Sequence, residues 1–211
     1  MSQQSMDRPR RGHPDDTRER LIRAAADTFN THGYAGTDVR RIVAAAGYAT
    51  GTFYRHFPHK GAALLAAYEG WVVAEWEALG AAVLAPGSAH ERAERIIDIS
   101  ADLHARWHGL REALASYRLV DEHATSAYRE LQRRQVAILA RLREQVSRST
   151  TRPPEADVLL VMLIERAVES MAIGEPAELG LSWDTMRALL IRAVADALSD
   201  GVHRTDPKPE V

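Results

Sequence analysis

The chain of 211 residues has no cysteine, which excludes disulfide bonds, zinc–thiolate sites and thiol nucleophiles. It also lacks long apolar runs, since the longest, residues 158–164, is far shorter than the roughly 20 residues of a membrane-spanning helix. The first residues contain no apolar segment like the core of a secretory signal peptide. We therefore expect a cytoplasmic protein with no membrane partner.

Patterns typical of β-strands are nearly absent, because β-branched residues never alternate over a sustained stretch. Alanine, leucine, arginine and glutamate dominate, and glycine and proline divide the chain into segments of helical periodicity. We predict an all-α fold of about nine helices, with an N-terminal three-helix domain and a larger helical domain. The expected helices span 15–32, 38–46, 50–56, 59–85, 89–108, 110–121, 125–148, 155–173 and 182–199, with a break at Gly109.

Acidic residues are scarce only at the start of the chain. Residues 1–60 hold 10 Lys and Arg against 6 Asp and Glu, a net charge of +4. The other 151 residues hold 17 against 23, a net charge of −6. A basic part attached to an acidic body favours a polyanion as the partner of the basic part, and ordinary scatter of charges is the alternative.

Residues 37–57 carry the pattern that is most informative about function. Thr37 is expected to cap the second helix, and Gly47 ends it. The third helix is too short to be stable alone, so it depends on packing, for which Phe53 and Phe57 are the expected anchors. Two such helices joined by a tight turn are typical of a helix-turn-helix motif.

The second helix of such a motif enters the major groove of DNA. The face of residues 50–56 opposite the two phenylalanines carries hydroxyl, aromatic and basic groups that can contact phosphates and base edges. We predict that this outer face binds DNA, and its residues are Thr50, Gly51, Thr52, Tyr54, Arg55 and His56.

Residues 17–65 resemble the DNA-binding domain of the TetR family of bacterial transcriptional regulators. About a dozen positions agree in order and spacing. They are Phe29, Gly33, Tyr34, Thr37, Ile42, Ala46, Gly47, Gly51, Thr52, Phe53, Tyr54, His56, Phe57 and Lys60.

The resemblance implies a set of DNA contacts. Phosphate contacts are expected from Thr37, Thr52, Tyr54, His56 and Lys60. Base contacts are expected from Thr50 and Gly51, with Tyr48 and Tyr54 as further candidates, and Arg40 and Arg55 are candidates for groove or phosphate contacts. Some of these side chains have other interpretations: Tyr54 packed on the first helix, His56 placed at a helix end, and Arg41 and Arg55 simply solvated.

Three positions depart from the family pattern. Ala49 stands where the family has a serine or threonine cap for the third helix, so the cap could pass to Thr50. At the start of the fourth helix, His59 replaces a small cap and Gly61 replaces an acidic residue. We expect these changes to weaken the two helix starts.

The resemblance also implies that the last two long helices pair with those of a second copy in a four-helix interface. Both helices have apolar stripes wide enough for this role, with core packing alone as the alternative. The expected interface residues are Leu159, Leu163, Met171, Met186, Leu190, Val194 and Ala197.

The helices between the N-terminal domain and this interface are expected to enclose a pocket for a small molecule. The candidate lining residues are aromatic or polar, although residues of these types more often belong to an ordinary core. They are Tyr68, Trp71, His104, Trp107, His108, Tyr117, Met162, Glu165 and Glu169. No cofactor is expected.

Two pairs in this set have a spacing of four residues. His104 and His108 could chelate a metal, hydrogen-bond a ligand or belong to a packed face, and we expect no metal. Glu165 and Glu169 could receive a cationic ligand, take part in hydrolysis, or face solvent and pair with Arg166.

The function favoured by these patterns is a transcriptional repressor that binds palindromic operator DNA as a homodimer and is released by an unknown small-molecule effector. An activator or co-regulator of the same architecture is the alternative. An enzyme is disfavoured, since the sequence has no nucleophile elbow or phosphate-cradling loop. The expected organisation is a disordered arm (1–14), a helix-turn-helix domain (15–60), an effector-binding and dimerisation domain (61–200) and a disordered tail (201–211).

Overall fold

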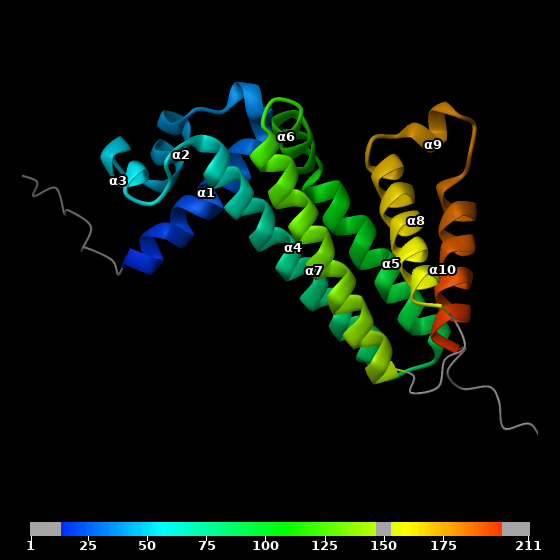
Figure 1. Cartoon of the computed structure of the whole chain (residues 1–211). Helices are drawn as coiled ribbons and strands as arrows, with labels where there is room; N and C mark the ends of the chain where they lie inside the picture. Colours follow the sequence, from blue (N-terminus) through cyan, green and yellow to red (C-terminus); the bar gives the residue numbers. More distant parts are fainter. Residues whose placement is uncertain (1–13, 147–152, 200–211) are drawn as a thin grey trace, which may run out of the picture. The chain divides into compact units, whose positions relative to one another are not determined.

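The computed structural model describes residues 14–146 and 153–199 (Figure 1). Within these ranges every regular element is a helix, which confirms the predicted all-α fold. The described residues form ten helices, and the one that was not predicted is the four-residue α9 (Glu175–Glu178). Apart from Pro14, the first residue of α1, the predicted arm and tail lie outside the described residues.

The chain divides into two compact units, which we call the head unit and the body unit. Of the described residues, the head unit contains those up to Tyr68 and those of Gly109–Ala124, and the body unit contains Glu69–His108 and those from Thr125 onward. Helices α4 (Lys60–Leu84) and α7 (Glu122–Val146) run from one unit into the other. The head unit therefore extends beyond residue 60, where the sequence pattern placed the boundary, and it includes most of α6 (His108–Arg118).

The first helix of the head unit, α1 (Pro14–Gly36), is interrupted close to its predicted end at residue 32. Gly33 has a φ of 64°, which a glycine adopts without steric cost, and one more turn follows it. The apolar stripe of α1 is buried at Leu21, Ala25 and Phe29. The helix packs against α2 (Val39–Ala46), whose Ile42 and Val43 are buried.

The cap of α2 differs from the prediction. Asp38, not Thr37, is the N-cap residue, and its Oδ1 accepts a hydrogen bond of 2.8 Å from the backbone N–H of Arg41. Aspartate and threonine are both common N-cap residues, so Asp38 can take the role that was predicted for its neighbour Thr37. Gly47 ends the helix as predicted, with a left-handed φ of 76°.

The third helix, α3 (Thr50–Tyr54), has five residues and ends two residues before the predicted position. Ala49 is its N-cap and makes no side-chain hydrogen bond, and Thr50 lies inside the helix, so no side chain has taken over the cap. Packing holds the helix in place, as expected, because Phe53 and Phe57 are buried with ring centroids 5.5 Å apart.

The predicted helix break at Gly109 was wrong, because Gly109 lies inside α6 and the break falls at Trp107. A β carbon at Gly109 would overlap the backbone oxygen of Asn30 on α1. The side-chain oxygen of Asn30 accepts a hydrogen bond of 2.9 Å from the backbone N–H of Leu110. This glycine therefore allows α6 to approach α1 closely.

The core of the body unit lies where α5 (Ala89–Arg106) packs against α8 (Pro154–Ala172) and α10 (Trp183–Ser199) (Figure 1). Ser88 and Glu91 form a capping box at the start of α5. The buried core residues come from α4, α5, α8 and α10. They are Ala82, Ala93, Ile96, Ile97, Ile164, Ala167, Val168, Leu190, Ile191 and Val194.

Two ion pairs link helices within the body unit. Arg187 on α10 donates to both carboxylate oxygens of Asp98 on α5, at 2.8 Å each. Arg166 on α8 donates to both oxygens of Glu175 on α9, at 2.8 and 2.7 Å. None of the helices in the described ranges is both long enough and apolar enough to cross a membrane.

Candidate nucleic-acid interface and internal cavity

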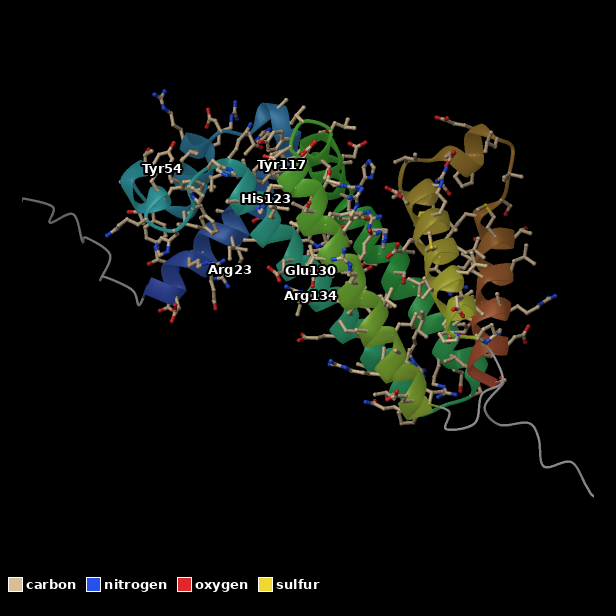
Figure 2. The ribbon with its side chains drawn as sticks, in the orientation of Figure 1. Arg23, Tyr54, Tyr117, His123, Glu130 and Arg134 are labelled. Atoms are coloured by element: carbon tan, nitrogen blue, oxygen red, sulfur yellow. The ribbon has the colours of Figure 1, made fainter. Side chains whose placement is uncertain are left out.

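The outer face of α3 is open. Thr50, Gly51 and Arg55 are exposed. Tyr54 is 57% exposed, and its ring lies perpendicular to that of Phe53 in the same helix, with centroids 5.6 Å apart (Figure 2). Among the described residues, no atom outside the helix lies within 4 Å of the place that a β carbon on Gly51 would occupy. Packing within the chain therefore does not require a glycine here, whereas close approach of a partner molecule to the helix would.

Basic groups flank this open face. The guanidinium of Arg55 donates a hydrogen bond of 3.2 Å to the hydroxyl of Thr52, and this contact holds two candidate phosphate donors together. Arg40 and Arg41 are exposed on α2. Tyr48 and His56 are half-buried beside α3. The side chains predicted to contact DNA from α2 and α3 thus retain surface that a duplex could reach.

Two other predicted phosphate contacts are engaged inside the head unit. The side chain of Thr37 is buried, and its hydroxyl donates to the carbonyl of Gly33 at 2.7 Å. The ammonium of Lys60 donates to the carbonyls of Tyr34 and Thr37, both at 2.7 Å, and lies 4.3 Å from the centroid of the Tyr34 ring. Partial burial lowers the pKa of Lys60, and the nearby Asp38 opposes this shift. Thr37 and Lys60 therefore hold the segment between α1 and α2 in place through backbone carbonyls.

The two residues that depart from the family pattern at the start of α4 each make a specific contact. His59 serves as a cap, since its Nδ1 accepts a hydrogen bond of 3.2 Å from the backbone N–H of Ala62. A β carbon at Gly61 would overlap the ring of Tyr117 on α6. The close contact between α4 and the Tyr117 ring of α6 therefore requires a glycine at position 61.

Tyr117 is fixed in the head unit and does not line the cavity described below. Its ring stacks on Tyr34 with centroids 4.6 Å apart, and its hydroxyl donates to Oδ2 of Asp121 at 2.7 Å. Burial raises the pKa of Tyr117, with a further contribution from the hydrogen bond to Asp121. The same hydrogen bond lowers the pKa of Asp121. The resulting cluster joins α6 to the C-terminal end of α1.

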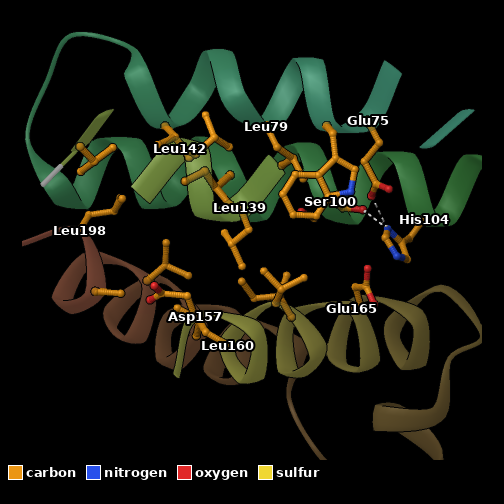
Figure 3. Close-up of a pocket in the computed structure, with 18 residues that line it drawn as sticks. Glu75, Leu79, Ser100, His104, Leu139, Leu142, Asp157, Leu160, Glu165 and Leu198 are labelled. Carbon is orange, nitrogen blue, oxygen red and sulfur yellow. Dashed lines mark hydrogen bonds and ion pairs between the residues drawn. The ribbon is translucent and has the colours of Figure 1, made fainter. Parts of the chain in front are cut away.

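The body unit contains a cavity of about 150 Å³ (Figure 3). Helices α4, α5, α7, α8 and α10 all contribute to its wall. Most of the lining is apolar, with Trp76, Leu79, Leu139, Leu142, Leu160 and Leu198 among its members. A mainly apolar cavity with a few polar groups at defined places is typical of a small-molecule site.

Three charged or titratable side chains, Glu75, His104 and Glu165, lie at one end of this cavity, and Asp157 lies toward the other (Figure 3). Nδ1 of His104 lies 2.9 Å from the carbonyl oxygen of Ser100 and 3.4 Å from Oε1 of Glu75. The carbonyl can only accept, so the shorter contact requires a proton on Nδ1. The side chains of His104 and Glu75 are 1% and 4% exposed. Glu165 lines the cavity from α8, and its carboxylate points toward the end where these two residues lie (Figure 3).

Of the predicted pocket residues, only His104 and Glu165 line this cavity. Trp71 is buried but does not line the cavity. Its ring packs against that of His104 at a steep angle, with centroids 5.8 Å apart. Met162 is 60% exposed. The remaining predicted residues, Tyr68, Trp107, His108, Tyr117 and Glu169, are absent from the wall.

The break between α5 and α6 separates His104 from His108, the two residues considered as a metal-chelating pair. Since α5 ends at Arg106, His104 and His108 belong to different helices and do not share a helix face. Among the residues described, no group of three or more His, Cys, Asp or Glu side chains could hold a metal ion.

Sequence reasoning missed Glu75, although a signal for it exists. Tyr68, Trp71, Val72, Leu79 and Ala82 recur at helical spacing along α4, and Glu75 interrupts this apolar stripe. A carboxylate is costly to bury unless it has a partner. Its position on the stripe could therefore have indicated either a buried partner or a ligand.

The exposed apolar residues of α8 and α10 differ in part from the predicted dimer interface. Leu159 and Leu163 are 68% and 53% exposed, as an interface role would require. Leu190 and Val194 are instead buried in the body core, and Ala197 lines the cavity. The exposed set is Leu159, Met162, Leu163 and Leu189, while Met171 and Met186 are half-buried.

A family model matches part of the head unit, whereas solved structures match nearly the whole chain. Residues 21–67 match the family model of bacterial regulatory proteins of the tetR family, which confirms the resemblance seen in the sequence. No curated protein matches the chain.

Solved structures share the fold over nearly the whole chain. FadR from Bacillus subtilis in complex with stearoyl-CoA is 19% identical, with a TM-score of 0.63 over 88% of this chain and 99% of its own. The fatty acid degradation regulator FadR from Bacillus halodurans is 18% identical, with a TM-score of 0.65 over 92% and 100%. A TetR-family transcriptional regulator from Streptomyces coelicolor is 20% identical, with a TM-score of 0.63 over 90% and 97%. At these identities the likeness establishes the fold.

Proposed function

From the premise that the chain is, by its N-terminal domain, a TetR-family transcriptional regulator, we propose that it is a repressor. In this proposal it binds palindromic operator DNA as a homodimer in the cytoplasm and is released by a small molecule held in the body unit. The observation that carries the DNA-binding part is the open outer face of α3, where Gly51 has no packing role and Tyr54 is exposed.

The DNA contacts in this proposal fall into two groups. Thr50, Gly51 and Tyr54 approach base edges, with Tyr48 at the margin. Arg40, Thr52, Arg55 and His56 bind phosphates, which fix register without reading sequence. Thr37 and Lys60 act indirectly, by holding the loop before α2 and the start of α4 in place.

The short length of α3, the helix proposed to contact base pairs, favours a dimer. A five-residue helix contacts too few base pairs to select a site, whereas two on a twofold axis read two half-sites about 34 Å apart or farther. The exposed apolar residues of α8 and α10, Leu159, Met162, Leu163 and Leu189, support an interface on these helices. We include Met171 and Met186 at its edge.

Release by a ligand is the regulatory part of the proposal. A ligand in the cavity changes DNA affinity only to the extent that it binds one dimer conformation more tightly than the other. The cavity and its polar end support such a site. An activator would use the same two sites with the opposite effect on transcription. The matching regulators are not described as enzymes, and we propose no catalytic role.

The test is selection of binding sites from random duplex DNA with the purified chain. We expect enrichment of a palindrome, and log affinity for it should fall steeply with log salt because several phosphates are contacted. In vitro transcription from a promoter that carries the palindrome then distinguishes a repressor from an activator. Enrichment of no sequence, even at low salt, would contradict the DNA-binding assignment.

A further inference from the structure

The cavity of the body unit is chemically asymmetric along its length. One end is formed by Glu75, His104 and Glu165, and the wall beyond them is mainly apolar, with Leu79, Leu139 and Leu160 among its members and one further carboxylate, Asp157, toward the opposite end (Figure 3). A ligand that fills it must therefore combine one polar group with an apolar body.

The charges of the wall decide the sign of that polar group. Three carboxylates, Glu75, Asp157 and Glu165, line the cavity, and no lysine or arginine does among the described residues. His104, the one basic side chain of this wall, already contacts Glu75 and the carbonyl of Ser100. A ligand carboxylate would add a like charge at this end, whereas an ammonium would be attracted to it.

An ammonium can be added without breaking the contacts that exist. A carboxylate has two oxygens with about four acceptor sites, so Glu75 can keep His104 and Glu165 its own contacts while both accept from a ligand. An ammonium brings three donors, which is enough to serve two carboxylates that line the same end of the cavity. The two carboxylates come from α4 and α8.

The volume limits the size of the apolar body. A cavity of about 150 Å³ is comparable to an engineered apolar cavity that takes benzene. It suits a body of about six carbon atoms, far smaller than a long acyl chain carrying a nucleotide.

We propose that this cavity binds a small amphiphilic amine, with its ammonium between Glu75 and Glu165 and its apolar body along Leu139 and Leu160. The inference rests on the proposed function, because the amine would be the effector that releases DNA. It distinguishes this chain from the FadR of Bacillus subtilis, which was solved with the anionic stearoyl-CoA.

The first experiment compares three ligands with the same six-carbon body, hexylamine, 1-hexanol and hexanoate, by titration calorimetry on the full chain. Hexylamine should bind at least tenfold more tightly than 1-hexanol, and hexanoate more weakly than either. Equal or tighter binding of hexanol or hexanoate overturns the inference. Failure of hexylamine to bind at millimolar concentration also overturns it.

A pair of variants locates the ammonium. Glu165→Gln should reduce hexylamine affinity about tenfold and leave hexanol affinity unchanged. Glu169→Gln, one turn along α8 and outside the cavity wall, is the matched control and should change neither. If the two variants behave alike, the assignment of the charge to Glu165 is wrong.

Operator binding separates this inference from the proposed function. Release of DNA by hexylamine supports both. Binding of hexylamine without any change in DNA affinity supports the ligand class and contradicts the effector role. Release by hexanoate and not by hexylamine overturns the ligand class and leaves the ligand-controlled regulator standing.

Discussion

The two units satisfy their buried hydroxyls alike and differ in where their other buried polar groups lie. Thr28 and Thr37 in the head unit donate to backbone carbonyls of α1 at 2.6 and 2.7 Å, and Ser170 in the body unit donates to the carbonyl of Ala167 at 2.8 Å. In the body unit, Glu75 and His104 meet at the wall of a cavity. The candidate site of the head unit is therefore an exposed outer face, that of α3, whereas the candidate site of the body unit is an internal cavity with buried titratable groups in its wall.

Removal of the head anchor should have the largest effect. Phe53 is fully buried and holds a helix that has no side-chain cap, so Phe53→Ala should cost about 3–5 kcal/mol of head stability. Hydrogen exchange should show lost protection in α2 and α3 with protection of α5, α8 and α10 retained. Phe53→Leu, as a control, should cost less. Equal loss in both units would show that they do not unfold separately.

A pair of glycine variants tests whether the head unit presents α3 outward. Gly109→Ala forces a β carbon onto the backbone oxygen of Asn30 and should destabilise the chain by about 3 kcal/mol. Gly51→Ala meets no atom outside its own helix, so it should raise stability by about 0.5–1 kcal/mol while lowering DNA affinity. Thermal unfolding and DNA titration measure both. Unimpaired DNA binding by Gly51→Ala would mean that the duplex does not approach α3 closely there.

A smaller effect is expected from a single atom on the outer face. Tyr54→Phe removes the exposed hydroxyl and should weaken operator binding by about 1 kcal/mol, roughly fivefold. The dimer and its unfolding temperature should not change, which analytical ultracentrifugation and calorimetry can check. An unchanged DNA affinity would exclude Tyr54 from the contacts.

The smallest effect is expected in the cluster formed by Tyr34, Tyr117 and Asp121. The hydrogen bond from Tyr117 lowers the folded pKa of Asp121, so its stabilisation is present above the unfolded value of about 4 and is lost as the pH falls through the folded value. Tyr117→Phe removes the donor. Urea unfolding at pH 7 and pH 3 should show a larger difference between the variant and the natural chain at pH 7. A difference independent of pH would contradict this role of Asp121.

Some features of both units could be predicted because they depend on residues near one another in the chain. Helical periodicity located nine of the described helices to within a few residues, and Gly47 marks a turn by its own backbone preference. The outer face of α3 was recognisable because Phe53 and Phe57, at helical spacing, assign the remaining side chains to the other side. Glu165 was a candidate because a charge interrupts an apolar helix.

Other features could not be predicted, because they arise between residues far apart in sequence. The cavity needs walls from five helices, so neither its volume nor the pairing of Glu75 with His104 could be derived from any one stretch. Leu190 and Val194 belong to the core, and Leu159 stays exposed, because neighbouring helices cover one side of α8 and α10 and leave another uncovered.

The sequence by itself determined the class of fold, the short helix with its exposed polar face and the basic charge around it, since these follow from local spacing and composition. Only the tertiary structure decided which glycines are needed. Gly61 resembles a weak helix start and Gly109 a helix break until Tyr117 and Asn30 are brought against them. The physical reason is steric: a glycine's local preference is visible in sequence, but the atoms that forbid a side chain there come from distant residues.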